Sequence, residues 1–435
     1  MKRIVFYLFV FVLIIQNSTM LQAQISAPEA SGVDVTNYSV FPEIDSIYIF
    51  CAESEVDEIG ILRMTTELEG TKTFLWEKYN NTTSEFEFYF SESSDELTSE
   101  ISGLTDGCYR ATLTQGANSI VDRAWIFNNW TITSGSSPDT LSNCEWFKLI
   151  GEFTSAELNY YDLADNTELQ VYKNIRVQWI DGDDVVAAVL NPQIFNPPTK
   201  NTDYTLRVYD KFDCEGTTEV TYESIVTKAV FSVDPQSGEA PLDVVFSNES
   251  ENGDFDKYEW FLFRDLEDIK REGEETEEPI DSIMIVAFDE NPIYTYEYTG
   301  NYMVKLVSKK ESKYHVCVDT VYLEDYIVVD SSFIAVPNVF TPNGDGTNDN
   351  FIVKFWSMES IEITILNRWG RKIHFWENDN IRGFENTWTA TVWDGRLMGG
   401  RYASPGVYYY NVVGEGRDGE RRRAHGFFHL FRNKD

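Results

Sequence analysis

The stretch Tyr204-Thr205-Leu206-Arg207-Val208-Tyr209 alternates apolar and polar side chains along six consecutive residues. Ser46-Ile47-Tyr48-Ile49-Phe50 and Phe86-Glu87-Phe88-Tyr89-Phe90 are further short runs of β-forming residues, and clusters of Gly, Asn and Asp separate such runs. Runs of this length and period are typical of strands in antiparallel sheets that have one buried face. Helical periodicity is weak after residue 24, and only Leu266 to Glu275 is expected to form one or two helical turns. The sequence therefore predicts an all-β fold of tandem sandwiches.

The charge of the chain excludes some functions. The 435 residues include 72 Asp and Glu but 35 Lys and Arg, which gives a formal net charge of −37. Such an acidic chain repels nucleic acid and anionic membrane surfaces. An aromatic content of 15% supplies the apolar area that a disordered acidic chain lacks. The net charge from residue 335 onward is +1, so two differently composed regions meet near residue 334.

The N-terminal residues resemble a secretory leader. Lys2 and Arg3 precede an apolar run from Ile4 to Ile15, and the small residue Ala23 ends the polar stretch that follows. This run is too short to span a bilayer of roughly 30 Å, so residues 1–23 are predicted to be a signal peptide. We expect an exported chain without a transmembrane segment after cleavage. The remaining 412 residues suffice for about four β-domains of roughly 100 residues each.

The five cysteines lie in the acidic part of the chain, at Cys51, Cys108, Cys144, Cys214 and Cys317. In an exported protein, bridges Cys51–Cys108 and Cys144–Cys214 would each close one sandwich, and Cys317 would be unpaired. Four unpaired buried thiols are the alternative, because spacing alone does not fix connectivity.

Two resemblances subdivide the region before residue 334. The stretch from Asn201 to Asp210, followed by Cys214-Glu215-Gly216, resembles an immunoglobulin-like repeat of large bacterial surface proteins. From Ala229 onward, Gly238 to Asn248, Tyr258-Glu259-Trp260 and Gly300 to Leu306 resemble a PKD domain, which is an Ig-like sandwich. The resemblance breaks after Trp260, where an acidic insertion from Asp265 to Glu278 is expected to be a solvated loop. The expected domains are 24–137, 138–228, 229–331 and 335–435.

The last region has a series of distinctive turns. A strand enters Val336 to Phe351, where Gly, Asn and Asp must visit positive φ and can hydrogen-bond their own loop. Ile361-Glu362-Ile363-Thr364-Ile365 and Asn367-Arg368-Trp369-Gly370 predict a hairpin into Lys372 to Phe375, and Val407–Val413 with Arg422–Phe431 predict a second hairpin. A small sandwich that contains both hairpins is expected.

In order and spacing, these blocks resemble the gliding-motility-associated C-terminal domain, the type B sorting signal of the type IX secretion system of Bacteroidota. The resemblance implies Sec export followed by transport across the outer membrane, with the type IX translocon and shuttle proteins as partners. The candidate recognition residues are Asn343, Asp345, Gly346, Asn348, Asp349, Asn367, Arg368, Trp369, Gly370, Trp393, Asp394, Gly395, Gly406 and Tyr408.

Some residues of this region allow two interpretations. Asn343, Asp345 and Asp349 have the alternate spacing of a calcium loop, but the glycine position and the missing bidentate Glu favour a self-bonded loop. Arg421-Arg422-Arg423 with Arg417 could form a basic docking patch or a solvated strand edge. His425 and His429 are expected to pack or to be exposed rather than to bind metal, because a third ligand is missing nearby in the sequence.

Export also suggests modification. Ser46, Thr140, Ser282 and Thr320 each follow Asp and precede an apolar residue, which resembles the O-glycosylation motif of Bacteroidota. Ser46 and Thr140 are expected at accessible domain edges.

Motifs of catalysis are missing from the sequence. We find no His-Glu-x-x-His, no Gly-x-Ser-x-Gly and no phosphate-binding glycine loop, and His315 is the only histidine outside the last region. We therefore expect a non-catalytic exported surface protein without a cofactor, namely an accessory subunit of the secretion or gliding machinery. The alternative is a surface adhesin or ligand-binding protein that uses its acidic N-terminal sandwiches.

Overall fold

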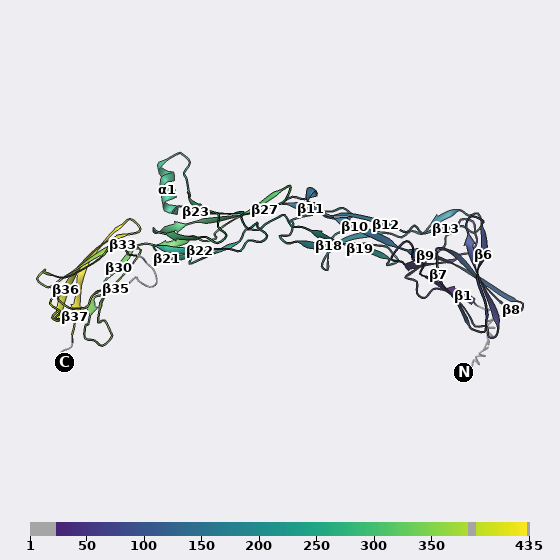
Figure 1. Cartoon of the computed structure of the whole chain (residues 1–435), viewed down its shortest axis with the longest axis horizontal. Helices are drawn as coiled ribbons and strands as arrows, with labels where there is room; N and C mark the ends of the chain where they lie inside the picture. Colours follow the sequence, from purple (N-terminus) through teal and green to yellow (C-terminus); the bar gives the residue numbers. More distant parts are fainter. Residues whose placement is uncertain (1–22, 382–388, 433–435) are drawn as a thin grey trace, which may run out of the picture. The chain divides into compact units, whose positions relative to one another are not determined.

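The computed structural model describes residues 23–381 and 389–432. The predicted signal peptide lies outside these residues except for Ala23, which begins the first strand. Across the described residues, helices that are long and apolar enough to cross a bilayer are absent. The predicted all-β class is confirmed, since the described elements are strands apart from one α-helix and one short 3₁₀ turn (Figure 1).

The chain forms two compact units. The first contains the described residues up to Ser142, together with Phe147–Phe195 and Asn201–Glu223. The second contains Asn143–Trp146, Asn196–Lys200 and the chain from Ser224 onward.

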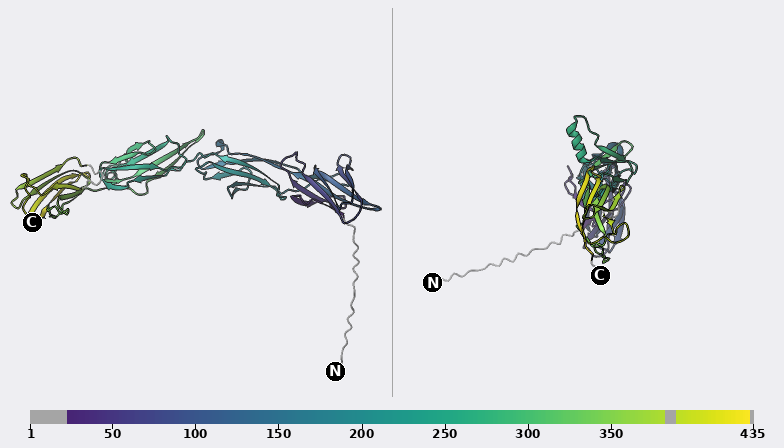
Figure 2. Two further views of the ribbon diagram at one scale, coloured as in Figure 1. Left: turned by 60° about the horizontal axis from the view of Figure 1, so that its bottom comes forward. Right: turned by 90° about the vertical axis from the view of Figure 1, so that its left-hand side faces the viewer.

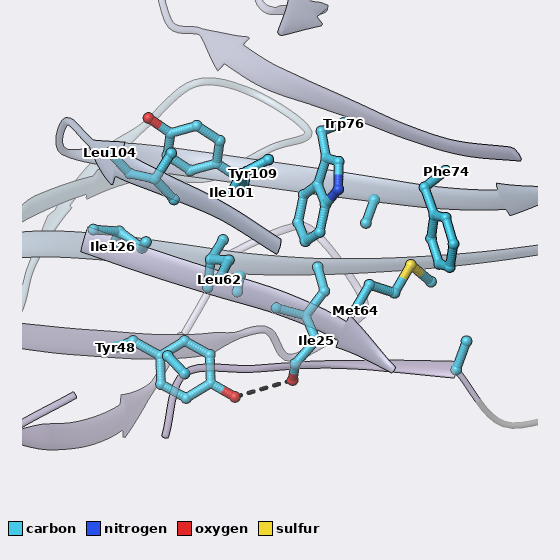
Figure 3. Packing of buried hydrophobic residues seen from close by; sticks show 14 of the residues in the cluster. Ile25, Tyr48, Leu62, Met64, Phe74, Trp76, Ile101, Leu104, Tyr109 and Ile126 are labelled. Atoms are coloured by element: carbon cyan, nitrogen blue, oxygen red, sulfur yellow. Dashed lines mark hydrogen bonds between the residues drawn. The ribbon is translucent and has the colours of Figure 1, made fainter. Parts of the chain in front are cut away.

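The first unit begins with a sandwich of two sheets. The larger sheet has the strand order β2 (Gly32–Val35), β3 (Ser46–Cys51), β9 (Asn118–Asn129), β8 (Gly107–Gln115), β5 (Lys72–Asn80) and β6 (Glu85–Ser94). The smaller sheet has the order β1 (Ala23–Ser26), β4 (Gly60–Thr66) and β7 (Thr98–Leu104). Leu62 and Met64 of β4 meet Phe74 and Trp76 of β5 in the core between the sheets (Figure 3). This sandwich therefore has a closed core of its own.

A second sandwich completes the first unit. Its largest sheet has the order β16 (Asp184–Ala187), β15 (Arg176–Asp181), β18 (Thr202–Tyr209) and β19 (Glu215–Tyr222). The remaining strands pair as β10 (Thr131–Ser136) with β12 (Ile150–Ser155), β11 (Trp146–Lys148) with β17 (Gln193–Phe195), and β13 (Asn159–Tyr161) with β14 (Glu168–Gln170). The alternation predicted for the stretch at 204–209 is confirmed, because Tyr204, Leu206 and Val208 are all buried in β18.

The division between these two sandwiches differs from the expected one. Strand β10 pairs with β12 over its whole length, so the chain joins the second sandwich from Thr131 onward. The expected division between residues 137 and 138 placed this strand in the first sandwich. A strand's own sequence indicates its buried face but not its neighbour, which explains the difference.

The predicted disulfides are wrong. Cys51 is bonded to Cys214 and Cys144 to Cys317, whereas Cys108 is a buried free thiol. Cys51 is the last residue of β3 and Cys214 directly precedes β19, so this bridge links the two sandwiches. Cys108 instead lies within β8, opposite Trp125, where its side chain fills the core.

The same joint has a shared hydrophobic core. Ile49 and Phe127 of the first sandwich cluster with Leu158, Tyr160 and Phe212 of the second. The carboxylate of the buried Asp162 accepts hydrogen bonds from the backbone N–H groups of Val40 at 2.6 Å and Phe41 at 3.1 Å. These burial and hydrogen-bond contacts tie the two sandwiches into one unit.

The second unit begins with a third sandwich. One sheet has the strand order β20 (Phe231–Asp234), β22 (Leu242–Asn248) and β25 (Ile293–Tyr296). A second sheet has the order β21 (Ser237–Glu239), β29 (Ile327–Asp330) and β26 (Gly300–Tyr302). The third sheet has the order β24 (Ile283–Ala287), β23 (Tyr258–Phe263), β27 (Val304–Glu311) and β28 (Val316–Tyr322). Trp260 is fully buried in the core of this sandwich.

The acidic insertion contains the predicted helix, α1 (Leu266–Glu275). Asp265 caps it by accepting hydrogen bonds from the backbone N–H groups of Glu267 and Asp268. All residues of α1 are at least partly exposed, and the helix stands away from the strands of its sandwich (Figures 1 and 2). The insertion is therefore solvated, but it is a capped helix rather than a loop.

The C-terminal domain is a small sandwich of two sheets. The smaller sheet has the strand order β30 (Phe333–Ala335), β32 (Phe351–Trp356) and β35 (Thr389–Trp393). The larger sheet has the order β31 (Val339–Phe340), β37 (Arg421–Leu430), β36 (Gly406–Gly416), β33 (Met358–Leu366) and β34 (Lys372–Asn378). Both predicted hairpins are present, as β33–β34 and β36–β37. Ile361, Ile363 and Ile365 face the core, as their alternation predicts.

Candidate recognition surface of the C-terminal domain

The loop at the entry of the C-terminal domain is held by its own side chains. The carboxylate of Asp349 accepts hydrogen bonds from the backbone N–H groups of Asn343 at 2.9 Å, Gly344 at 2.6 Å and Gly346 at 2.7 Å. These N–H groups, with that of Gly344 contributing most, lower the pKa of Asp349. Gly344, Gly346 and Asn348 have φ values of 80°, 84° and 53°, which confirms the predicted left-handed backbone.

The same hydrogen bonds occupy the carboxylates that would have to bind calcium. Both carboxylate oxygens of Asp349 already accept backbone donors, and Asp345 accepts from the side chain of Asn343 at 2.8 Å and from the Thr347 N–H at 2.8 Å. A cation would have to displace these donors. The geometry therefore supports the self-bonded loop.

Two of the candidate turns lie near each other in space. At Gly395, which has a φ of 80°, an added Cβ would come within 3.0 Å of Pro342 and 3.1 Å of Phe340. The turn after Trp393 thus packs against the strand that leads into the Asp349 loop. Glycine suits this position because of both its φ and the close contact.

The turn from Asn367 to Gly370 reverses the first hairpin. The side-chain oxygen of Asn367 accepts hydrogen bonds from the N–H groups of Trp369 at 2.9 Å and Arg371 at 3.0 Å. Trp369 is 79% exposed, and the guanidinium of Arg368 lies 4.9 Å from its ring centre. Among the candidates, Arg368 and Trp369 are therefore accessible to a partner.

Other candidates build the domain core instead. Trp393 and Tyr408 are 1% and 8% exposed, and their rings pack at 5.7 Å from each other. The Trp393 indole N–H donates to the carbonyl of Arg396 at 2.7 Å. These two side chains are therefore part of the domain core.

Aromatic side chains gather on the outer face of the larger sheet, which the smaller sheet leaves uncovered. We define the outer aromatic face as Val407, Tyr409, Phe427, His429 and Phe431. Tyr409 lies opposite Phe427, and Val407 lies opposite His429, on the paired strands β36 and β37. Tyr409, Phe427 and Phe431 are 44%, 56% and 54% exposed. Contiguous exposed aromatic groups of this kind mark interaction sites in soluble proteins.

The sequence contains a signal for this face that the candidate residues missed. Tyr408-Tyr409-Tyr410 and Phe427-Phe428 place aromatic residues at successive positions of a strand. Because successive side chains point to opposite faces, such runs must put aromatic rings both in the core and outside it.

The basic residues divide between two environments. Arg417 donates to the side chain of Glu297 at 2.9 Å and to the carbonyl of Ile381 at 3.1 Å, so it joins the C-terminal domain to the third sandwich. Arg422 binds Ser332 and Asp418, whereas Arg421 and Arg423 are exposed. A patch of all four arginines is therefore not formed.

The two histidines of β37 lie on its outer side. His425 is exposed, and the ring of His429 lies 5.7 Å from each of the rings of Phe427 and Phe431. This geometry fits aromatic packing at the outer aromatic face.

The four glycosylation candidates lie in different surroundings. Thr140 is exposed in the 3₁₀ turn Asp139–Leu141, and Thr320 is exposed in β28. Ser46 is in β3, between β2 and β9, so the expectation that it lies at an accessible, loop-like edge is wrong. Ser282 is partly buried directly before β24.

Comparison with protein families supports the sorting signal. Residues 334–430 match the family model of the CHU_C type IX secretion signal domain. This match confirms the prediction that the C-terminal domain is a type IX sorting signal. The chain thus carries a signal for export by the type IX system, and the signal domain contains the Asp349 loop, the Trp369 turn and nearly all of the outer aromatic face. No curated protein matches the chain.

Three of the solved structures that match the chain are segments of several domains or repeats. One is a tetra-tandem repeat from the extending region of a large adhesion protein, with 12% identity, coverage of 94% of this chain and 99% of that one, and a TM-score of 0.26. Another is a three-domain segment of titin, I67–I69, with 11% identity, coverage of 67% and 96%, and a TM-score of 0.29. A third contains three N-terminal domains of the bacteriophage RB49 Hoc protein, with 12% identity, coverage of 66% and 96%, and a TM-score of 0.24.

Proposed function

We propose that this chain is a non-catalytic surface protein that stays bound to the outer-membrane translocon or shuttle through its signal domain, as an accessory subunit of the secretion or gliding machinery. The observation that carries this proposal is the outer aromatic face. It lies on the domain that matches a secretion signal, and its rings are exposed without being needed for the core. Rigid aromatic groups are common anchors at protein interfaces.

The location of the face leaves it free for a partner. Arg417 and Asp418, in the turn between β36 and β37, contact the third sandwich and the connection to it. Tyr409 and Phe427 lie toward the other end of the same hairpin. Contact with the third sandwich therefore leaves the outer aromatic face uncovered.

The connection between the third sandwich and the signal domain supports retention of the signal. Strand β29 ends at Asp330 and β30 begins at Phe333. Between them, Ser332 is 7% exposed, and both its N–H and its hydroxyl donate to Asp418. A protease needs an extended, accessible segment, and this short, partly buried connection does not offer one.

The test uses the full chain, expressed in its native host in place of the resident copy. Tyr409→Glu combined with Phe427→Glu should leave the protein in the periplasm, because two carboxylates would have to be desolvated at the interface. Deletion of residues 335–435 should have the same result. Protease accessibility on intact cells measures surface exposure, and a pulldown from detergent-solubilised outer membranes measures translocon binding.

The matched control is Tyr172→Glu combined with Tyr314→Glu, which changes two aromatic residues that are 75% and 51% exposed outside the signal domain. This control should reach the surface normally. Thermal unfolding of each purified variant checks that the signal domain remains folded. Normal export and translocon binding of the Tyr409/Phe427 variant would refute the role of the outer aromatic face.

The first sandwich favours a second candidate function, a surface protein that binds a ligand. Its edge strand β6 exposes Phe88 by 72%, Tyr89 by 40% and Phe90 by 39%. Efficient surface display without recovery of translocon proteins in the pulldown would favour this candidate.

A further inference from the structure

A cleft in the first unit is lined by residues of both N-terminal sandwiches. Lys78 and Glu87 come from β5 and β6, Asp106 directly precedes β8, and Asn159 and Tyr161 come from β13 of the second sandwich. The shared core and the Cys51–Cys214 bridge hold the two walls in one unit. Both walls of the cleft therefore belong to one unit, so the cleft is not a gap between independent domains.

A β-bulge turns aromatic rings toward this cleft. On the strand pair β5–β6, Trp76 lies opposite Phe90 but its neighbour Glu77 lies opposite Phe88, so Tyr89 is an extra residue. Regular alternation would place Phe88 and Tyr89 on opposite faces, yet both line the cleft. The Tyr89 ring packs edge-on against Tyr109 at 5.3 Å, which leaves it 40% exposed. Bulges that re-aim a side chain in this way are common next to binding sites.

The polar groups of the cleft retain hydrogen-bonding capacity. The side-chain amide of Asn159 and the hydroxyls of Tyr89 and Tyr161 have no hydrogen-bond partner among the described residues. The Asn80 amide donates to Glu87 at 2.7 Å, which orients this carboxylate and leaves it further acceptor positions. Donors and acceptors thus stand beside the aromatic rings.

The charges of the cleft exclude a strongly anionic ligand. Lys78 is its cation, and Glu87 and Asp106 are carboxylates. Burial lowers the pKa of Lys78, which disfavours its positive charge, and raises that of Asp106, which disfavours its negative charge. A phosphate or sulfate group would therefore find little compensation here.

Gly107 lines the cleft next to Lys78. A Cβ added at Gly107 would lie 2.8 Å from Cε of Lys78. A larger residue would therefore require the Lys78 side chain to move.

We propose that this cleft binds a neutral saccharide, with sugar C–H groups on the rings of Tyr89 and Phe88 and sugar hydroxyls on Asn159, Glu87 and Tyr161. A sugar ring presents apolar C–H faces and a rim of hydroxyls that both donate and accept. Aromatic faces beside amides and carboxylates match both features. This inference deepens the second candidate function and does not depend on the translocon.

The test measures binding to the purified mature chain, with both disulfides formed. The probes are immobilised neutral oligosaccharides of glucose, mannose, galactose and N-acetylglucosamine, with a heparin hexasaccharide as the anionic comparison. We expect at least one neutral probe to bind and heparin not to bind. Calorimetric titration of the same probe in solution then gives its affinity.

Variants locate the site. Tyr89→Ala and Asn159→Ala should each weaken binding about tenfold, because each removes a ring or an amide that the sugar would contact. Tyr172→Ala and Asn118→Ala are the matched controls, since both residues are exposed outside the cleft, and they should bind like the unchanged chain. Gly107→Ala should also weaken binding. Thermal unfolding verifies that the variants are folded.

Two results would overturn the inference: failure of every neutral probe to bind, or binding that Tyr89→Ala and Asn159→Ala leave unchanged. Both results concern the purified chain, so they can be separated from a failure of the export proposal, which is measured by surface exposure in cells.

Discussion

Cys51 at the end of β3 is bonded to Cys214 directly before β19, so one covalent bond joins the first two sandwiches. Phe212, two residues before Cys214, packs in the same shared core as Ile49, two residues before Cys51. Covalent and hydrophobic contacts therefore meet at one joint. A joint of this kind makes the two sandwiches a single unit for unfolding.

Peptide mapping without reduction tests the disulfides. We expect Cys51 linked to Cys214, Cys144 linked to Cys317, and Cys108 as a free thiol. Replacing Cys51 and Cys214 together by Ala should lower the free energy of unfolding of the first unit by about 2–5 kcal/mol, because a long loop is released. Cys108→Ala is the control and should change it by about 1 kcal/mol. A bridge that contains Cys108 would contradict the structure.

Asp349→Ala tests the self-bonded loop. Loss of this carboxylate removes the acceptor for three backbone N–H groups, so the amides of Gly344 and Gly346 should exchange hydrogen faster. The rest of the signal domain should keep its protection, because Asp349 lies outside the core. Asp379→Ala, a change of an exposed aspartate elsewhere in the domain, should leave both glycine amides protected. Unchanged exchange in the Asp349 variant would show that the loop is held by other contacts.

The stability of the second unit should fall at acid pH because of Asp418. Burial raises the pKa of its carboxyl, but hydrogen bonds from Ser332, Arg422 and Glu420 outweigh burial and lower the pKa to about 2. A lowered pKa stabilises the fold above the ordinary value of 3.8, and this contribution is lost as the pH falls through about 2.

We expect the loss to be about 1–2 kcal/mol, measured as the pH dependence of thermal unfolding between pH 5 and about 2. Asp418→Asn should flatten this part of the profile. Asp394→Asn, which changes a carboxylate that is 58% exposed, should preserve it. An identical profile for the unchanged chain and Asp418→Asn would disprove this origin of the acid sensitivity.

Glycosylation is predicted at Thr140 of protein purified from the native host. Thr140 is exposed in a short turn between β10 and β11, where a transferase can reach it. Ser46 should be unmodified, because β3 pairs on both sides. Intact mass and peptide mapping measure both positions, and Thr140→Ala should remove the added mass. A mass equal to that of the bare chain from 24 to 435 would rule out modification.

Much of the fold follows from local sequence patterns. Ile361, Ile363 and Ile365 alternate with polar residues and indeed face the core. Glycine and Asx residues marked the left-handed loop at Gly344 and Gly346. Such features depend on neighbours in sequence, which a single sequence contains.

The cysteine pairing and the cleft could not be predicted in this way. Cys51 and Cys108 are both on strands of the first sandwich, but their partners depend on how the second sandwich packs against it. Tyr89 lines the cleft because of a bulge in the pairing of β5 with β6, which changes the face of one residue. Pairing register and domain contacts connect residues that are distant in sequence, so local periodicity does not contain them.

The two disulfides interleave along the chain, since Cys144 lies between Cys51 and Cys214, and Cys214 lies between Cys144 and Cys317. A single peptide-bond cut between residues 51 and 144 is spanned by the first bridge, and a cut between 214 and 317 is spanned by the second. A cut between 144 and 214 is spanned by both. Extracellular proteases that nick the chain once anywhere from Cys51 to Cys317 would therefore leave all of its pieces covalently attached to the signal domain.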